Sequence, residues 1–171
     1  MTEFGQLYAI AQIAIAISGF AALVVAFKQR RDGMWSAADA DRFHGMLAHG
    51  LAAAFFCILP PVVAVFTENT ERLWSICSAL LGIQILAQST LIALLPSSNM
   101  YTRLGLIPPL LAAALLGANV FGGDGLAEFG PYLVGILWHT FQSGVLFFLL
   151  IRVPATRMLS HTVGKKDDNV T

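Results

Sequence analysis

Residues 129–151 read FGPYLVGILWHTFQSGVLFFLLI and contain no charged side chain. At a rise of about 1.5 Å per residue, a helix of this length matches a hydrocarbon core about 30 Å thick. Four further uncharged runs precede it, at residues 4–27, 43–67, 73–102 and 104–123. The pattern predicts five membrane-spanning helices.

The composition points in the same direction. The chain is 57% hydrophobic and 12% charged, which leaves too little polar surface to cover a soluble protein. We therefore expect an all-α, polytopic bundle of five transmembrane helices, with spans at about 4–27, 43–67, 73–95, 104–121 and 131–152. Residues 1–153 would form this membrane domain, and the polar residues 154–171 a disordered cytoplasmic tail.

The basic residues predict the orientation of the bundle. Five crossings place the connecting segments alternately on two sides of the membrane, and Arg72 is the one basic residue on its side. The other side receives Lys28, Arg30, Arg31, Arg42, Arg103, Arg152, Arg157, Lys165 and Lys166. By the positive-inside rule, that side is the cytoplasm, so the N-terminus lies outside and the C-terminus inside. We expect a multi-pass protein of a bacterial-type inner (plasma) membrane.

Several function classes are disfavoured by what the sequence lacks. There is no clustered basic face for nucleic acid, and no Asp, Glu, Lys or Arg lies within a span to drive an ion-coupled carrier. Cys57 and Cys77 lie in apolar runs without metal-binding spacing, which is typical of buried small hydrophobic residues. Because no nucleophile and base pair or phosphate loop is present, we expect neither an enzyme nor a cofactor or metal.

Neutral polar residues inside the spans are the candidate lining of a pore or cavity. They are His139, Gln142, Ser143, Gln84, Gln88, His49 and Asn119. His139, Gln142 and Ser143 share one helix face, as do Gln84 and Gln88. His139 is the first choice, because it is deep, lies next to a Trp and can change charge near neutral pH. The alternative is that each residue only forms an interhelical hydrogen bond, worth about 0.6 kcal/mol on average.

Two adjacent prolines, Pro60 and Pro61, interrupt the second span. Proline lacks an amide donor, so the carbonyls of Phe56 and Cys57 lose their helical partners. The pair either bends the helix around its neighbours or provides a gate or carbonyl ligands beside a cavity.

The first functional hypothesis is a homo-oligomeric channel or passive permease for a small ion or solute, pH-responsive through an intramembrane histidine. Its pore would lie on a symmetry axis, lined by the third and fifth spans, because five helices with few polar groups scarcely enclose a pathway. The alternative is a non-catalytic accessory or assembly subunit of a larger membrane complex. In either case a ridge of small residues on the first span would pack against a helix, namely Ala14, Ser18, Ala22 and Ala26.

A third hypothesis is a haem-binding redox protein with His49 and His139 as axial ligands. One iron requires both histidines at the same depth. Counting the helical rise from the ends of the uncharged runs puts them roughly 10 Å apart along the membrane normal, which disfavours this hypothesis.

Overall fold

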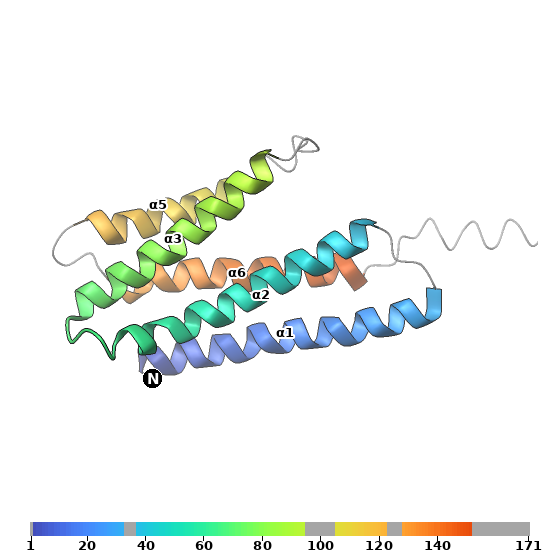
Figure 1. Cartoon of the computed structure of the whole chain (residues 1–171), viewed down its shortest axis with the longest axis horizontal. Helices are drawn as coiled ribbons and strands as arrows, with labels where there is room; N and C mark the ends of the chain where they lie inside the picture. Colours follow the sequence, from blue (N-terminus) through green and yellow to red (C-terminus); the bar gives the residue numbers. More distant parts are fainter. Residues whose placement is uncertain (1, 33–36, 95–104, 123–127, 152–171) are drawn as a thin grey trace, which may run out of the picture.

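The computed structural model describes residues 2–32, 37–94, 105–122 and 128–151, so the predicted tail at 154–171 lies outside the described residues. The described chain is all-helical, as predicted. Its helices are α1 (Glu3–Asp32), α2 (Ala37–Val63), α3 (Thr70–Leu94), α5 (Ile107–Phe121) and α6 (Phe129–Ile151). Successive helices run in opposite directions along one common axis (Figure 1).

Four of these helices are long and apolar enough to cross a membrane. The qualifying segments are Glu3–Phe27 of α1, Ala38–Val63 of α2, and the whole of α3 and α6. The helix at the predicted fourth span differs, because α5 has only 15 residues. That is about 22 Å of helix against a hydrocarbon core of about 30 Å. Pro108 and Pro109 lie in the first turn of α5, where the missing amides have no helical partner to lose.

The five helices form two groups that meet at α6. In one group α2 lies between α1 and α6, and in the other α5 lies against α3 (Figure 1). Both α3 and α5 also contact α6. Because α6 touches every other helix, polar side chains on its buried face can bond to several helices at once.

A glycine allows the closest approach within the first group. A Cβ atom added at Gly50 of α2 would clash with the hydroxyl oxygen of Ser18 on α1 and lie 3.2 Å from that of Ser143 on α6. Small residues at helix crossings are the usual means of close packing in membranes. Gly50 therefore fixes the point at which α1, α2 and α6 meet.

The predicted ridge on α1 is only half correct. Ala14 and Ser18 are buried against α2, but Ala22 and Ala26 are exposed in this chain. The buried side of α1 continues instead through Leu7, Ala11 and Ala21. The reason is that α1 presents residues at spacings of three and four alternately, whereas the predicted ridge used a spacing of four throughout.

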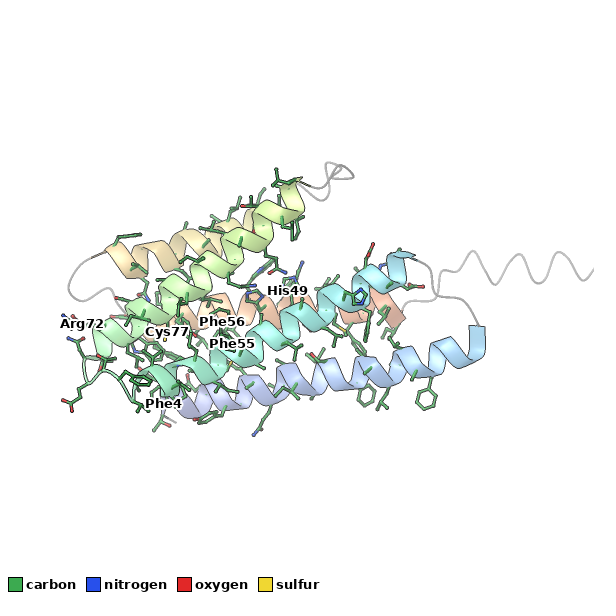
Figure 2. All side chains as sticks on the ribbon, viewed as in Figure 1. Phe4, His49, Phe55, Phe56, Arg72 and Cys77 are labelled. Atoms are coloured by element: carbon green, nitrogen blue, oxygen red, sulfur yellow. The ribbon has the colours of Figure 1, made fainter. Side chains whose placement is uncertain are left out.

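Aromatic side chains close the end of the bundle where α1 begins. The Trp74 ring packs against Phe4, Phe129 and Tyr132, with ring centroids 6.4, 5.2 and 5.6 Å away. Trp74 and Tyr132 are 2% and 0% exposed. Figure 2 shows Phe4, Phe56 and Cys77 at this same end, and His49 midway along the bundle. The aromatic end is therefore packed with side chains, and polar groups gather nearer the middle.

Pro60 and Pro61 lie within α2, which continues through them to Val63. The carbonyl oxygen of Phe56, which would accept from residue 60 in an unbroken helix, accepts a hydrogen bond from the Tyr132 hydroxyl at 2.6 Å. The carbonyl that Pro60 leaves without an amide donor is thus satisfied by α6.

Candidate functional site

Two histidines from different helices meet at the middle of the bundle. The Nδ1 atoms of His49 on α2 and His139 on α6 are 2.9 Å apart, and the residues are 8% and 1% exposed. The predicted separation of roughly 10 Å along the membrane normal is therefore wrong. Ala37, where α2 begins, and Ile151, where α6 ends, lie at the same end of the bundle (Figure 1). His49 and His139 are each twelve residues away from that end along their helices, so they lie at the same level. Counting from the start of the uncharged run at residue 43 ignored residues 37–42, roughly the first one and a half turns of α2.

Two glutamines of α3 join the histidines into a closed ring of hydrogen bonds. The Nε2 atom of His139 lies 2.8 Å from Oε1 of Gln84, and Nε2 of His49 lies 3.3 Å from Nε2 of Gln88. Gln84 then donates from Nε2 to Oε1 of Gln88 at 3.2 Å. We call these four side chains the His–Gln ring. It joins α2, α3 and α6.

The positions of the protons in the His–Gln ring follow from its amide groups. Gln88 can only donate from Nε2, so Nε2 of His49 accepts and a neutral His49 carries its proton on Nδ1. That proton is donated to Nδ1 of His139, whose own proton is on Nε2 and is donated to Gln84. Each of the four side chains therefore donates once and accepts once around the ring. The arrangement is satisfied when both histidines are neutral.

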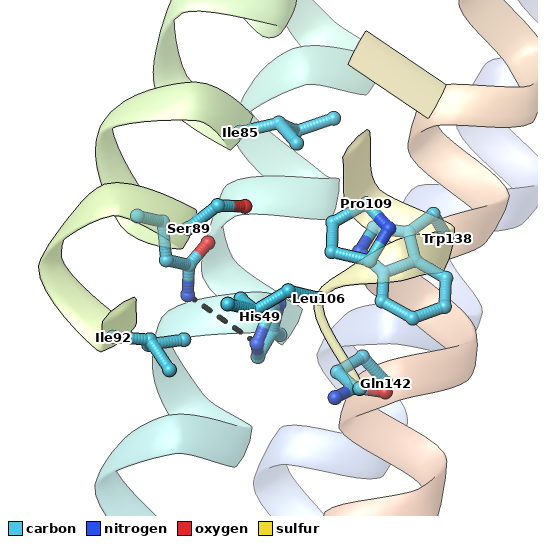
Figure 3. A pocket seen from close by; sticks show the side chains of 10 residues that line it. His49, Ile85, Ser89, Ile92, Leu106, Pro109, Trp138 and Gln142 are labelled. Carbon is cyan, nitrogen blue, oxygen red and sulfur yellow. Dashed lines mark hydrogen bonds between the residues drawn. The ribbon is translucent and has the colours of Figure 1, made fainter. Parts of the chain in front are cut away.

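A cavity of about 210 Å³ adjoins the His–Gln ring (Figure 3). The described residues that line it come from α2, α3, α6, the first turn of α5 and the two residues before α5: His49, Ile85, Gln88, Ser89, Ile92, Gly105, Leu106, Pro109, Trp138 and Gln142. None of these carries a charge when histidine is neutral. Four polar side chains thus face a space whose remaining walls are apolar.

Two of the polar groups around the cavity have no hydrogen-bond partner among the described residues. Ser89 is 6% exposed, and Gln142 of α6 lines the same cavity. A buried hydroxyl normally finds a partner, as that of Ser18 does with the carbonyl of Ala14 at 2.9 Å. Ser89 and Gln142 are therefore available to whatever occupies the cavity.

The remaining predicted residues lie apart from the cavity and have structural partners. Ser143 donates to the carbonyl of Met46 at 3.1 Å and so ties α6 to α2. Asn119 on α5 donates to the Ser78 hydroxyl at 2.7 Å and accepts from the Glu128 amide at 2.8 Å. These bonds explain both residues as links between helices.

The geometry also bears on metal and haem binding. Among the described residues, no group of three or more His, Cys, Asp or Glu could hold a metal ion. An ion between two opposed imidazoles holds the nitrogens roughly 4 Å apart, since each metal–nitrogen bond is about 2 Å. The spacing of 2.9 Å between the facing nitrogens of His49 and His139 is that of a hydrogen bond. Cys57 and Cys77 are free and buried, in the state expected from the sequence.

Sequence reasoning named His49, Gln88 and Gln142 of the cavity lining but left out two other lining residues, Ser89 and Trp138. Ser89 follows Gln88 directly, so its apparent helix face differs from that of the glutamines. Nothing in the sequence shows that α5 begins beside it. Comparison with protein-family models, curated proteins and solved structures finds no match to this chain.

Proposed function

We propose that this is a passive permease or channel for a small uncharged solute, with the His–Gln ring and its cavity on the pathway through each protomer. The observation that supports it most is the ring itself, a closed set of four neutral polar side chains at the middle of an apolar bundle. Interhelical attachment alone needs fewer such groups, because single bonds from Ser143 and Tyr132 already tie α6 to α2.

A pathway inside the protomer fits the burial of the polar side chains. His139 and Ser143, which were expected to face a symmetry axis between subunits, are 1% and 0% exposed within one bundle. The cavity lies on one side of the His–Gln ring, and the aromatic cluster around Trp74 lies towards the other end. The ring would then be the constriction between a cavity that solute can reach and a closed end that must open for passage.

Acid is expected to change this constriction. A proton added to either histidine lets that imidazole donate from both ring nitrogens. The four contacts of the ring then hold five donors, so at one contact, with the other histidine or with a glutamine amide, two donors oppose each other. The side chains of α3 that bond the rings, Gln84 and Gln88, carry no charge and cannot compensate. Protonation therefore opens the His–Gln ring.

Other titratable groups lie about two helical turns or more from the His–Gln ring in sequence, or are exposed. Cys57, Cys77 and Tyr132 are seven or eight residues away along α2, α3 and α6, towards the aromatic end. In the other direction on α2, His44 is exposed and Arg42 pairs with Asp39 at 3.3 Å. The two histidines are therefore the groups through which pH acts on the ring.

We further propose that α5 also crosses the membrane, with the N-terminus outside and the C-terminus in the cytoplasm. The alternating direction of the helices and the distribution of basic residues support this topology. The bilayer can thin locally around a helix as short as α5, at a modest cost per ångström of mismatch. A bacterial-type inner membrane is the expected location.

Assembly into a homo-oligomer is supported by one polar residue on the outer face of α1. Gln12 is exposed, has no hydrogen-bond partner among the described residues, and is surrounded by the exposed Ile13 and Ile15. A glutamine in hydrocarbon is costly unless another helix bonds to it. A second copy of α1 would supply an identical amide across a two-fold axis.

The test is flux in proteoliposomes with urea, glycerol and K⁺ as probes, from pH 8 down to about pH 3.5, a range that includes the usual titration of histidine and extends well below it. The expected result is saturable or leak-like flux of urea or glycerol that changes on acidification. His139→Gln keeps a hydrogen-bonding side chain but cannot titrate, so it should lose the pH response. Thr140→Ala is the matched control, because its hydroxyl donates to the carbonyl of Ile136 in its own helix.

Two outcomes contradict the proposal. Absence of flux for all three probes would favour an accessory subunit, which co-purification with a larger complex from its native membrane would identify. An unchanged pH profile in His139→Gln would leave the histidine pair as a purely structural link.

A further inference from the structure

We propose that the cavity beside the His–Gln ring binds a small, flat, uncharged ring compound that carries a hydroxyl or carbonyl group. The chemistry is that of a phenol or of the head group of a quinone. This inference rests on the cavity and not on flux, so it stands or falls separately from the permease proposal.

The volume of the cavity sets the size of the ligand. A closed apolar cavity of about 150 Å³ is known to accept benzene. The cavity beside the ring measures about 210 Å³, which leaves space for one six-membered ring and a few substituent atoms. A haem or a fused polycyclic molecule is too large.

The walls set its shape and charge. The indole of Trp138 on α6 and the ring of Pro109 on α5 lie side by side at one edge of the cavity, opposite Ser89 (Figure 3). Flat faces of this kind favour a flat ligand, which gains contact by offset stacking. Because no lining side chain carries a fixed charge, an ion would enter without a counter-charge and lose its hydration. The ligand is therefore uncharged.

The unpartnered polar groups set its substituents. Ser89 is 6% exposed, yet its hydroxyl bonds to no described residue, and Figure 3 shows it directed towards Pro109 and Trp138. The neighbouring Thr90 behaves differently, because its hydroxyl donates to the carbonyl of Leu86 at 2.8 Å. A hydroxyl or carbonyl oxygen on the ligand can accept from Ser89 or from the Gln142 amide. The bond to Ser89 satisfies a hydroxyl that is otherwise buried without a partner, and the bond to Gln142 satisfies a partly exposed amide that has none among the described residues.

The experiment titrates phenol and benzene into the purified full-length protein in mild detergent, with empty micelles subtracted. Calorimetry should show saturable binding of one phenol per chain, about fivefold to tenfold tighter than benzene, as one or two hydrogen bonds would provide. Ser89→Ala should bring phenol affinity down towards that of benzene and leave benzene binding unchanged. Thr90→Ala, one residue away but bonded to its own helix, should change neither affinity.

A second variant keeps the test decisive if Ser89→Ala is poorly folded. Gln142→Leu removes the other unpartnered group, and it should reduce phenol binding but not benzene binding. Competition by a benzoquinone with a decyl tail distinguishes the two sources of such a ring. Displacement of phenol by the tailed compound indicates a natural ligand that is dissolved in the membrane. Displacement by short phenols alone indicates a solute that enters from water.

Phenol uptake that is linear, or identical in wild type, Ser89→Ala and Gln142→Leu, would overturn the proposal and show that the cavity holds water only. Phenol binding without flux of urea or glycerol would support this inference while the permease proposal failed. Flux of urea or glycerol without phenol binding would support the permease proposal and overturn this inference.

Discussion

A double-mutant cycle on the two histidines tests the His–Gln ring directly. The perturbations are His49→Leu, His139→Leu and both together. Each replaces an imidazole by an apolar side chain of similar size. Each single variant removes two bonds of the His–Gln ring, whereas the double variant removes three, because the bond between the histidines is shared. The effects of the two substitutions should therefore not add.

The size of the departure from additive free energies follows from the strength of hydrogen bonds between membrane helices. At about 0.6 kcal/mol per bond, each single variant loses about 1.2 kcal/mol and the double variant about 1.8, against about 2.4 for additive effects. The coupling energy is then about 0.6 kcal/mol, rising to about 1.7 for a strong bond. The measurement is the free energy of unfolding of the four proteins in mixed detergent micelles. Changes in transfer and packing that occur in both backgrounds cancel in the cycle.

A control cycle combines His139→Leu with Asn119→Leu, because Asn119 shares no hydrogen-bond partner with His139 in the described structure. Its coupling should stay within about 0.3 kcal/mol, the usual error of additivity. A third cycle pairs His49 with Gln84, which lie across the ring and do not bond to each other. Coupling there measures cooperativity around the ring. Coupling below about 0.3 kcal/mol for the two histidines would refute the His–Gln ring.

Three further substitutions test the links that hold the site in place. Gly50→Ala should destabilise the protein by about 1–3 kcal/mol through overpacking, whereas Gly117→Ala, which meets open space, should be neutral or stabilising in thermal unfolding. Asn119→Leu should cost about 1–3 kcal/mol, because it leaves the buried Ser78 hydroxyl without its donor, and an unchanged unfolding midpoint would contradict its structural role. Tyr132→Phe should cost about 0.6–1.7 kcal/mol in wild type but less after Pro60→Ala, which returns an amide donor to the same carbonyl. Equal costs in both backgrounds would contradict that account.

The helices could be predicted from the sequence because lipid requires every backbone group to bond within its own segment. Long uncharged runs therefore indicate helices. All five helices were located in this way, and four of them are long enough to span a membrane. The remaining helix, α5, was predicted to be too long, because an uncharged run also includes the apolar residues of the preceding turn. Leu106, just before α5, belongs to the uncharged run but is not helical. Hydropathy alone does not distinguish apolar residues in a helix from apolar residues in the turn before it.

The members of the site were identifiable, but their arrangement was not. Neutral polar residues are rare in spans, so His49, His139, Gln84 and Gln88 were all selected. Their pairing depends on where each helix begins relative to the others, and an error of one and a half turns at the start of α2 separated the histidines by about 10 Å. The selection rule also included Asn119, whose partners are at a different level of the bundle. Composition identifies polar residues, whereas helix offsets decide which ones meet.

The His–Gln ring has a property that its individual bonds do not. Reversing the direction of all four bonds requires both histidines to change tautomer and both amides to rotate, and the reversed ring is satisfied equally well. No arrangement of the same four side chains satisfies a ring with one histidine protonated, since that histidine donates from both nitrogens and one contact of the ring must then hold two opposed donors. The neutral ring is thus satisfied in either direction, while a single added proton leaves it satisfied in neither. A solute that lies in the cavity beside Gln88 would sense this break through the one amide that both sites share.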